Sequence, residues 1–506
     1  MNRTVRLGVA TTLVVVCLSL LDVSVFAQKK RKPRRKRAKV ARILLPSVLA
    51  SQQANIPANV IPQTSASANN IQSGLRPTAG SDSRVTKSAL AASQTKAPGS
   101  KIIAPTLSGL PAPTLVQAGE VIISELRLRG PAGAEDEFIE LYNNTDSDII
   151  VESLDGTGGW TVALSDGTIT GPIFTIPNGA LIPARGHRLG GNSNGYSLCN
   201  YPGGDGSAVF STAKGPEPAA LAAPCVPNGV SGTFAHTIPN HTWDFDVPDG
   251  AGVALFATTN GLNFTAATRL DAVGFTNSPA LYKEGNGILN VVTANLEHTY
   301  YRDLSSVTPR DTADNASDFL LVGTTPGLQV TRLGAPGPEN LQSPIVNNTT
   351  IAGTLYNPSV PASSSPNRDR IPTPEPNADF GTMLIRRTIT NNTGLPISRL
   401  RFRVINITSF GTPGCSAPSC AELRALTSAD EPVGGPVVVL GLRLEEPPEQ
   451  AGGGANNSSL SADVITILNP ILPGESRNVV FKLGVMRTGS FKFFVNIEAL
   501  NGSGIT

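Results

Sequence analysis

The 506-residue chain is rich in turn-forming residues and poor in charge, with 50 Gly, 41 Pro and 15% charged residues. This composition is typical of a β protein with many turns, and the length allows two or three domains that each bury a core. The net charge of +2 is uneven, because residues 117–506 hold 23 Lys and Arg against 36 Asp and Glu, a net charge of −13. An acidic folded region excludes nucleic-acid binding through its own surface, since phosphate neutralisation dominates such affinity.

Residues 1–27 have the pattern of a signal peptide. Arg3 and Arg6 precede an apolar run from Leu7 to Leu21, and Val25-Phe26-Ala27 forms a small-x-small cleavage site. The apolar run is short for a hydrocarbon layer of ~30 Å. We therefore expect a secreted or cell-surface protein whose mature chain has no transmembrane span.

A basic arm at residues 28–42 follows the leader. Its run from Lys29 to Arg42 contains ten Lys and Arg, and charge placed directly after an apolar segment resists translocation, so an uncleaved anchor with a cytoplasmic body stays the alternative. The arm is either a binding site for anionic envelope polymers or extracellular nucleic acid, or a solvated terminus without a partner. No aromatic residue interleaves it, so base stacking is not supported. The polyanion-binding candidates are Lys29, Lys30, Arg31, Lys32, Arg34, Arg35, Lys36 and Arg37.

Residues 43–116 are rich in Ala, Ser, Pro, Gln and Thr and contain no Phe, Trp or Tyr, which predicts a disordered, flexible linker. A folded region then begins with Val121–Tyr142, where two alternating segments flank a Gly-Pro turn. This pattern predicts a hairpin with one face buried. Short strands separated by turns recur every eight to twelve residues after it, which is the rhythm of a β-sandwich or barrel.

The motifs of this region come in a characteristic order: Ile123–Leu126, Glu137–Asn143, Gly159–Val162, Phe174–Pro177, Leu270–Phe275, Arg302, Asp311–Phe319 and Thr325–Gly327. That order resembles the lamin-tail domain, an immunoglobulin-like β module of nuclear lamins and many secreted bacterial proteins. The resemblance implies a sandwich over residues 117–332 and a structural role for Glu140. Residues 189–242, a Gly/Pro-rich insertion, depart from the family's compact pattern.

A second region repeats the β pattern after a Pro/Asn/Ser-rich linker at residues 333–377. Residues 378–506 are expected to form another immunoglobulin-like sandwich. Asn391–Leu395 and Leu400–Val404 resemble segments of carboxy-terminal Ig-like domains of secreted bacterial proteins. The expected strands are Thr382–Thr390, Ser398–Ile407, Pro436–Leu444, Val464–Leu468, Val479–Val485 and Phe491–Leu500. The predicted fold is thus all-β, with two antiparallel sandwiches joined by Pro/Ser-rich linkers.

Four cysteines remain after the leader, and an even number in an exported chain suggests disulfides. We expect Cys199 to pair with Cys225 and Cys415 with Cys420, because each pair falls within one predicted domain; two pairs of reduced thiols are the alternative. Zinc is not expected, since the spacings are not CxxC. The histidines are also scattered without ligand spacing: His187, His236, His241 and His298.

Two motifs carry a hint of chemistry. Ser193 lies in a G-x-S-x-G pattern, yet no apolar strand feeds it and no helix follows, so we interpret the match as coincidence in a Gly/Asn/Ser loop. Asp244, Asp246 and Asp249 lie near a Gly turn and are calcium candidates, although the spacing is one residue off the calcium-loop pattern and no Glu closes it. A solvated hairpin tip is the competing interpretation, and the same holds for Asp311, Asp314 and Asp318.

Acidic and aromatic residues near the first hairpin are interpreted as structural. Glu137 and Glu140 belong to a carboxylate group with Glu135 and Asp136, but their spacing of three sends them to opposite faces of a strand, which excludes an acid/base pair. The tryptophans, Trp160 and Trp243, are expected in the core or at the edge of the sandwich. An exposed Trp would instead suggest a sugar-stacking platform.

Together these features predict a non-enzymatic structural or adhesive binding protein without a cofactor, whose ligand is a cell-envelope, matrix or carbohydrate polymer. Two alternatives stay open. Lamin-tail domains also resemble modules appended to secreted hydrolases and nucleases, so the chain could be an accessory module of such an enzyme or hold a cryptic active site in residues 189–255 that uses Ser193, Asp244 and Asp246. The basic arm could also bind nucleic acid or another anionic polymer by itself.

Overall fold

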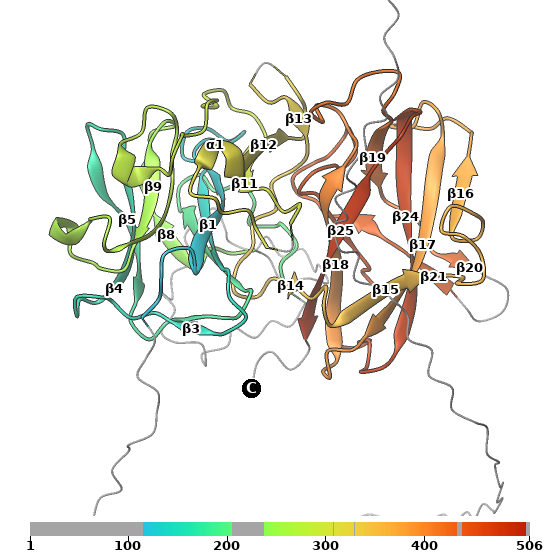
Figure 1. Ribbon diagram of the computed structural model, residues 1–506, viewed down its shortest axis with the longest axis horizontal. Helices are drawn as coiled ribbons and strands as arrows, with labels where there is room; N and C mark the ends of the chain where they lie inside the picture. Colours follow the sequence, from blue (N-terminus) through green and yellow to red (C-terminus); the bar gives the residue numbers. More distant parts are fainter. Residues whose placement is uncertain (1–114, 205–236, 307, 328, 433–437, 502–506) are drawn as a thin grey trace, which may run out of the picture. The chain divides into compact units, whose positions relative to one another are not determined.

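The computed structural model describes residues 115–204, 237–306, 308–327, 329–432 and 438–501 (Figure 1). These residues belong to one compact unit, Ala104–Thr506. The all-β prediction is confirmed: strands form two sandwiches, and the one α-helix of the described residues is the short turn α1 (Asn315–Asp318). Two 3₁₀ turns, Gly261–Asn263 and Ala280–Tyr282, complete the helical content of this part. It contains no helix long and apolar enough to cross a membrane.

The first sandwich packs a seven-stranded sheet on a four-stranded one. The larger sheet has the order β13 (Arg332–Leu333), β12 (Phe319–Gly323), β11 (His298–Arg302), β1 (Val121–Arg127), β2 (Phe138–Asn143), β7 (His187–Asn192) and β8 (His241–Trp243). The smaller has the order β10 (Arg269–Val273), β9 (Gly252–Phe256), β4 (Gly159–Ser165) and β5 (Thr170–Pro177). A two-stranded ribbon joins β3 (Ile149–Ile150) to β6 (Leu181–Ile182). Trp160, fully buried, lies in the core cluster.

The expected hairpin is present, with β1 antiparallel to β2, but its alternation is interrupted. A β-bulge lies between Ile123 and Glu125, where the pairing register shifts. An extra residue reverses the face to which the following side chains point. Ile123 and Leu126 therefore both lie in the core, although residues three apart point to opposite faces of a regular strand. The expectation of one solvated face is wrong, because every residue of β1 is buried. The polar row, Glu125 included, is covered by segments from the second half of the chain.

The second sandwich also has two sheets. One has the order β14 (Ile345–Val346), β25 (Phe493–Asn501), β18 (Ile397–Ile407), β23 (Ser459–Ser461) and β22 (Arg443–Leu444). The other has the order β15 (Ile351–Leu355), β17 (Thr382–Asn391), β24 (Ser476–Arg487), β21 (Val438–Gly441) and β20 (Glu431–Pro432), with β16 (Arg368–Ile371) pairing β17 and β19 (Glu422–Leu426) pairing β24. Both sandwiches contain parallel pairs besides the expected antiparallel ones, such as β7 with β8 and β21 with β24.

Three boundaries differ from the sequence-based expectation. The stretch 333–377 is not a plain linker, because β14, β15 and β16 lie in it and pair with β25 and β17. The expected strand Val464–Leu468 is absent from the described residues, where this segment forms turns. The insertion 189–242 begins inside β7 and ends inside β8, while its residues 205–236 lie outside the described residues. Short edge strands with Pro and Asn escape recognition because their apolar periodicity covers few residues.

Candidate functional site

The three calcium candidates do not converge on one point. The Asp249 carboxylate pairs with Arg129, whose Nε lies 3.0 and 2.9 Å from its two oxygens. Burial, and then the charge of Asp249, raises the pKa of Asp246. Within the described residues, two groups of His, Cys, Asp or Glu bring ligand atoms within 4.8 Å of one another, and neither includes Asp244, Asp246 or Asp249.

The G-x-S-x-G segment is shaped by packing. Ser193 donates from Oγ to the Trp243 carbonyl at 2.9 Å, so its hydroxyl serves to fix β8 beside the loop. A Cβ on Gly191 would lie 2.5 Å from Pro239 Cγ, and one on Gly195 would lie 2.3 Å from the Glu135 backbone. Close backbone approach therefore accounts for both glycines of the motif.

Glu137 and Glu140 point to different environments, as the strand spacing predicts. Glu137 accepts hydrogen bonds from the side chains of Asn192 at 2.8 Å and Trp243 at 3.0 Å. Burial raises its pKa to about 8. Glu140 instead accepts from Ser124 Oγ at 2.5 Å on the other side of the sheet. The two carboxylates contact different strands of the larger sheet and share no space for a substrate.

Both tryptophans lie in the core, which confirms that interpretation against an exposed sugar platform. Trp160 is fully buried and donates from Nε1 to the Glu152 carbonyl at 2.8 Å. Trp243 is 4% exposed and stacks on Phe174, with ring centroids 5.8 Å apart. Their indole N–H groups are satisfied, as buried tryptophans require.

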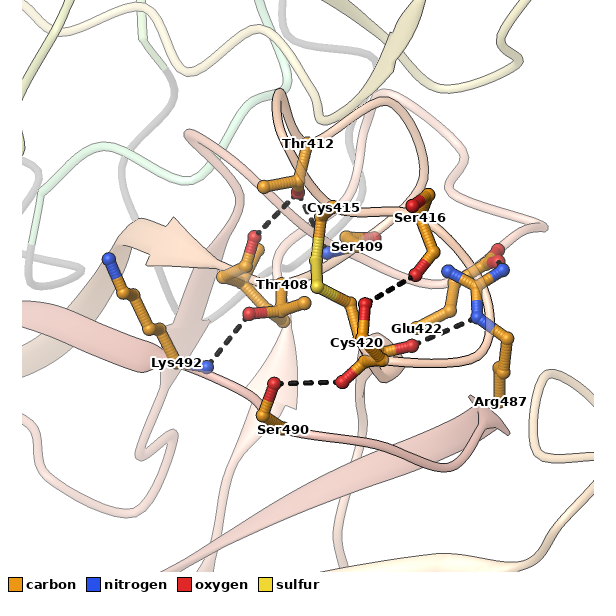
Figure 2. Close-up of a disulfide and its surroundings, with 12 residues drawn as sticks. Thr408, Ser409, Thr412, Cys415, Ser416, Cys420, Glu422, Arg487, Ser490 and Lys492 are labelled. Carbon is orange, nitrogen blue, oxygen red and sulfur yellow. Dashed lines mark hydrogen bonds and ion pairs between the residues drawn. A yellow bond between two sulfur atoms is a disulfide. The ribbon is translucent and has the colours of Figure 1, made fainter. Parts of the chain in front are cut away.

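The Cys415–Cys420 disulfide is confirmed and closes a short loop before β19 (Figure 2). The loop is held further by Thr412 Oγ1, which donates to the Ile407 carbonyl at 3.2 Å, and by Ser490 Oγ, which donates to the Ser419 carbonyl at 2.9 Å. Cys199 is also disulfide-bonded. Its expected partner, Cys225, lies outside the described residues, as do His236, the signal peptide and the basic arm 28–42 with all its candidate lysines and arginines.

We expect the double variant Cys415→Ser, Cys420→Ser to lose about 2 kcal/mol of stability, because the bond closes a loop of few residues and the entropic gain grows only with the logarithm of loop length. Urea unfolding of the variant and the oxidised parent measures this. The β-sheet circular dichroism of the variant should stay unchanged, since hydrogen bonds also fix the loop. Loss of the fold on substitution would contradict a local role.

A buried network of charges joins the two sandwiches, and sequence reasoning missed it. Strand β18 carries arginines at alternate positions, which on a strand predicts one solvated face, but all of them are buried here. They face carboxylates from both sandwiches and from the segment between them. The network contains Glu125, Glu140 and His187 from the first sandwich, Glu339 from the connecting segment, and Arg399, Arg401, Arg403, Glu445 and Glu498 from the second.

His187 lies in this network between two carboxylates. Its Nδ1 lies 3.0 Å from Glu140 Oε1 and its Nε2 lies 3.1 Å from Glu339 Oε2. The imidazole and carboxylate groups of these three side chains offer ligand atoms suited to a divalent cation. Glu339, however, is already contacted by Arg401 and by Arg403, whose Nη2 lies 3.0 Å away. The arrangement therefore acts as an ion-paired joint, beside a cavity of about 40 Å³, room for a few waters.

A second group of carboxylates surrounds Arg302 within the first sandwich. Its guanidinium lies 2.8 Å from Asp271, 3.2 Å from Asp311 and 3.9 Å from Glu284. Burial, and then Asp271 and Asp311, raises the pKa of Glu284 to about 8. The Arg302 guanidinium thus supplies the positive charge among these carboxylates that a metal ion would otherwise supply. The candidates Asp311 and Asp318 belong to this group, since Asp318 lies 3.6 Å from Arg302 and accepts from Thr312 N at 2.8 Å.

An open groove of about 680 Å³ lies beside the Cys415–Cys420 loop. Side chains of both sandwiches line it, and its size is within the ~300–1,000 Å³ range of ligand sites. Its lining combines hydroxyls with cationic groups, among them Thr408, Ser490, Arg310, Arg332 and Lys492. Figure 2 shows the Lys492 side chain extending away from the disulfide while its backbone N donates to Thr408 Oγ1 at 2.8 Å.

The groove has more positive than negative charge. Arg310 Nε lies 3.3 Å from Asp318, whereas Arg332 and Lys492 take part in no ion pair among the described residues. Asp303 is the one carboxylate in the lining. Isolated cations on separate strands leave no periodic signal in a sequence, so the groove could not be found before the fold was known.

No protein-family model matches the chain, and no curated protein is significantly similar to it in sequence.

Proposed function

We propose that this protein is a secreted or cell-surface, non-enzymatic binding protein whose groove holds an acidic carbohydrate or related envelope or matrix polymer. In this proposal the first sandwich is a lamin-tail-like domain and the second an Ig-like domain. The buried network links the two through ion pairs and hydrogen bonds.

The observation that carries the proposal is the pair of unpaired cations in the groove. The region from residue 117 onward has a net charge of −13, and most arginines of its described residues are ion-paired, with Arg368 and Arg387 among the exceptions. Arg332 and Lys492 therefore stand out as positions where an anion is attracted instead of repelled. The surrounding hydroxyls of Thr408 and Ser490 suit sugar oxygens, which both donate and accept hydrogen bonds.

A binding role is favoured over catalysis by the state of the candidate catalytic groups. The Ser193 hydroxyl donates to a backbone carbonyl. Glu137 is held by buried donors, and Glu140 is fixed between Ser124 and His187. Each of these groups is engaged in structure, whereas a nucleophile needs a base within hydrogen-bond reach and room for a substrate.

The test is calorimetric titration of the full chain with polygalacturonate and with neutral galactan. We expect polygalacturonate to bind and the double variant Arg332→Gln, Lys492→Gln to weaken it about tenfold or more, since hydrogen bonds to charged groups contribute roughly 1.5–3 kcal/mol each. Lys482→Gln is the matched control, because Lys482 is paired with Glu375 and lies outside the groove lining.

Binding should weaken as salt is raised. A variant without residues 29–42 distinguishes binding in the groove from binding by the basic arm. If binding is lost in this deletion variant but kept in Arg332→Gln, Lys492→Gln, the ligand binds to the arm. Release of shortened polymer over hours would favour the hydrolase alternative instead.

A further inference from the structure

The second sandwich has an open apolar groove between its two sheets, with a volume of about 390 Å³. One wall comes from β25 through Phe493 and Val495, and the other from β17 and β24 through Ile385 and Phe481. These side chains also belong to, or pack against, the core of this sandwich. The groove is thus an opening into a hydrophobic core.

A charged residue occupies the inward row of β17 at this opening. Ile385 and Ile389 point into the core, and Arg387, placed between them in the alternating row, lines the groove. Its neighbour Arg386 points the other way and pairs with Asp369 and Glu431. An arginine on a core-facing row is costly unless an anion or water compensates it.

A second arginine lies at the same groove. Arg368 stacks over the Phe491 ring with its Cζ 5.9 Å from the centroid. Neither Arg368 nor Arg387 takes part in an ion pair within the described residues; Arg387 donates from Nη1 to the Arg386 carbonyl at 2.7 Å. Burial, and then the like charge of Arg368, lowers the pKa of Arg387. The two guanidinium groups thus raise each other's electrostatic energy without a counter-charge.

We propose that this groove binds a long-chain carboxylate, with the apolar tail against Ile385, Phe481, Phe493 and Val495 and the head between Arg368 and Arg387. The apolar wall matches an alkyl chain, since burying methylene groups is what such a surface favours. The arginine pair matches a carboxylate, which a guanidinium binds with two parallel hydrogen bonds. This groove shares Phe491 with the groove of the proposed function, but its arginines are different ones, and the proposal does not depend on that function.

An inward-pointing charge can also protect an exposed edge strand from pairing with another chain. That explanation is not needed for Arg387, because β15 pairs with β17 at residues 387–391 and β16 pairs with it at residues 382–385. Most of the β17 edge is thus already covered.

Calorimetric titration of the full chain with sodium dodecanoate tests the proposal, with dodecyltrimethylammonium as a probe of the same tail and opposite head charge. We expect one dodecanoate per chain and at least tenfold weaker binding of the cationic probe. Arg387→Met should weaken dodecanoate about tenfold or more, and Arg368→Met should do the same. Val495→Trp should abolish binding of both probes by filling the groove.

Arg386→Met is the matched control, because Arg386 neighbours Arg387 on β17 and points away from the groove; it should leave dodecanoate affinity unchanged. The variant Arg332→Gln, Lys492→Gln should also leave it unchanged. Circular dichroism of each variant verifies the fold. Absence of saturable dodecanoate binding would overturn the proposal, and so would equal affinity of folded Arg387→Met and parent. Binding of galacturonate oligomers that Arg387→Met abolishes would overturn it in favour of a carbohydrate.

Discussion

Replacing Arg401 with Met is expected to destabilise the protein by about 3–5 kcal/mol, the cost of removing one partner from a buried ion network. Arg401 is fully buried. Its Nε lies 2.6 Å from Glu498 Oε2, its Nη2 contacts Glu339, and its Nη1 lies 3.8 Å from Glu445 Oε2. Methionine would fill much of the volume but would leave these carboxylates facing one another without the charge that compensates them.

The measurement is the free energy of unfolding in urea at neutral pH. Arg477→Met is the matched control: Arg477 also lies on a strand of the second sandwich and also pairs with a carboxylate, Glu475, but is partly exposed. An exposed pair contributes about 0–1 kcal/mol, so this variant should change stability little.

A double-mutant cycle isolates the pair. Removing both charges with Arg401→Met and Glu498→Gln should cost less than the sum of the single changes, since fewer unpaired charges are left. Equal effects of Arg401→Met and Arg477→Met would show that the network does not hold the sandwiches together. Additive effects in the cycle would show that Arg401 and Glu498 are not coupled.

The all-β class and the two sandwiches could be predicted because they depend on local patterns. Alternation in β1, β2 and β17 and the Gly/Pro turns each extend over enough residues to show. The bulge at Ser124 could not be predicted, because one extra residue changes which face is buried without changing composition. β14 and β15 were assigned to a linker since their pairing partners, β25 and β17, come later in the chain.

The charged joint and both grooves depend on contacts between residues far apart in the chain. Arg401, Arg403 and Glu498 have the alternating pattern of a solvated strand face, and only the packing of one sandwich against the other makes that face buried. The sequence of β18 did contain one signal of this burial. Its arginines occupy alternate positions of a strand whose other residues are mostly apolar, as in a core. Arg387 was equally visible as a charge in an apolar row.

Replacing Glu125 with Gln is expected to change how stability depends on pH. Burial first, and then the charge of Glu140, raises the pKa of Glu125 to about 7 despite the opposing effect of Arg403. Its carboxylate accepts hydrogen bonds from Gly337 N at 3.0 Å and from Asn457 Nδ2 at 3.1 Å. The folded protein therefore keeps a proton on Glu125 that the unfolded chain releases near its ordinary pKa of 4.5.

The sign follows from proton linkage. Between about pH 4.5 and pH 7 the folded state binds more protons than the unfolded state, so Glu125 lowers the stability of the parent as pH rises through this window. Gln does not titrate and lacks this loss. The stability of Glu125→Gln relative to the parent should thus increase by roughly 2–3 kcal/mol from pH 5 to pH 8, at 1.36 kcal/mol per pKa unit.

Urea unfolding of parent and variant at pH 5 and pH 8 measures this difference, in which the titration of all other groups largely cancels. Glu498→Gln is the control, because the pKa of Glu498 is lowered in the folded protein whereas that of Glu125 is raised. Burial alone would raise the pKa of Glu498, but Arg401 and Arg403 hold it below its ordinary value. Glu498 is therefore ionised in both states from pH 5 to pH 8, and its replacement should cost the same at both. If Glu125→Gln shows the same constant cost, Glu125 is ionised in the folded protein throughout this pH range.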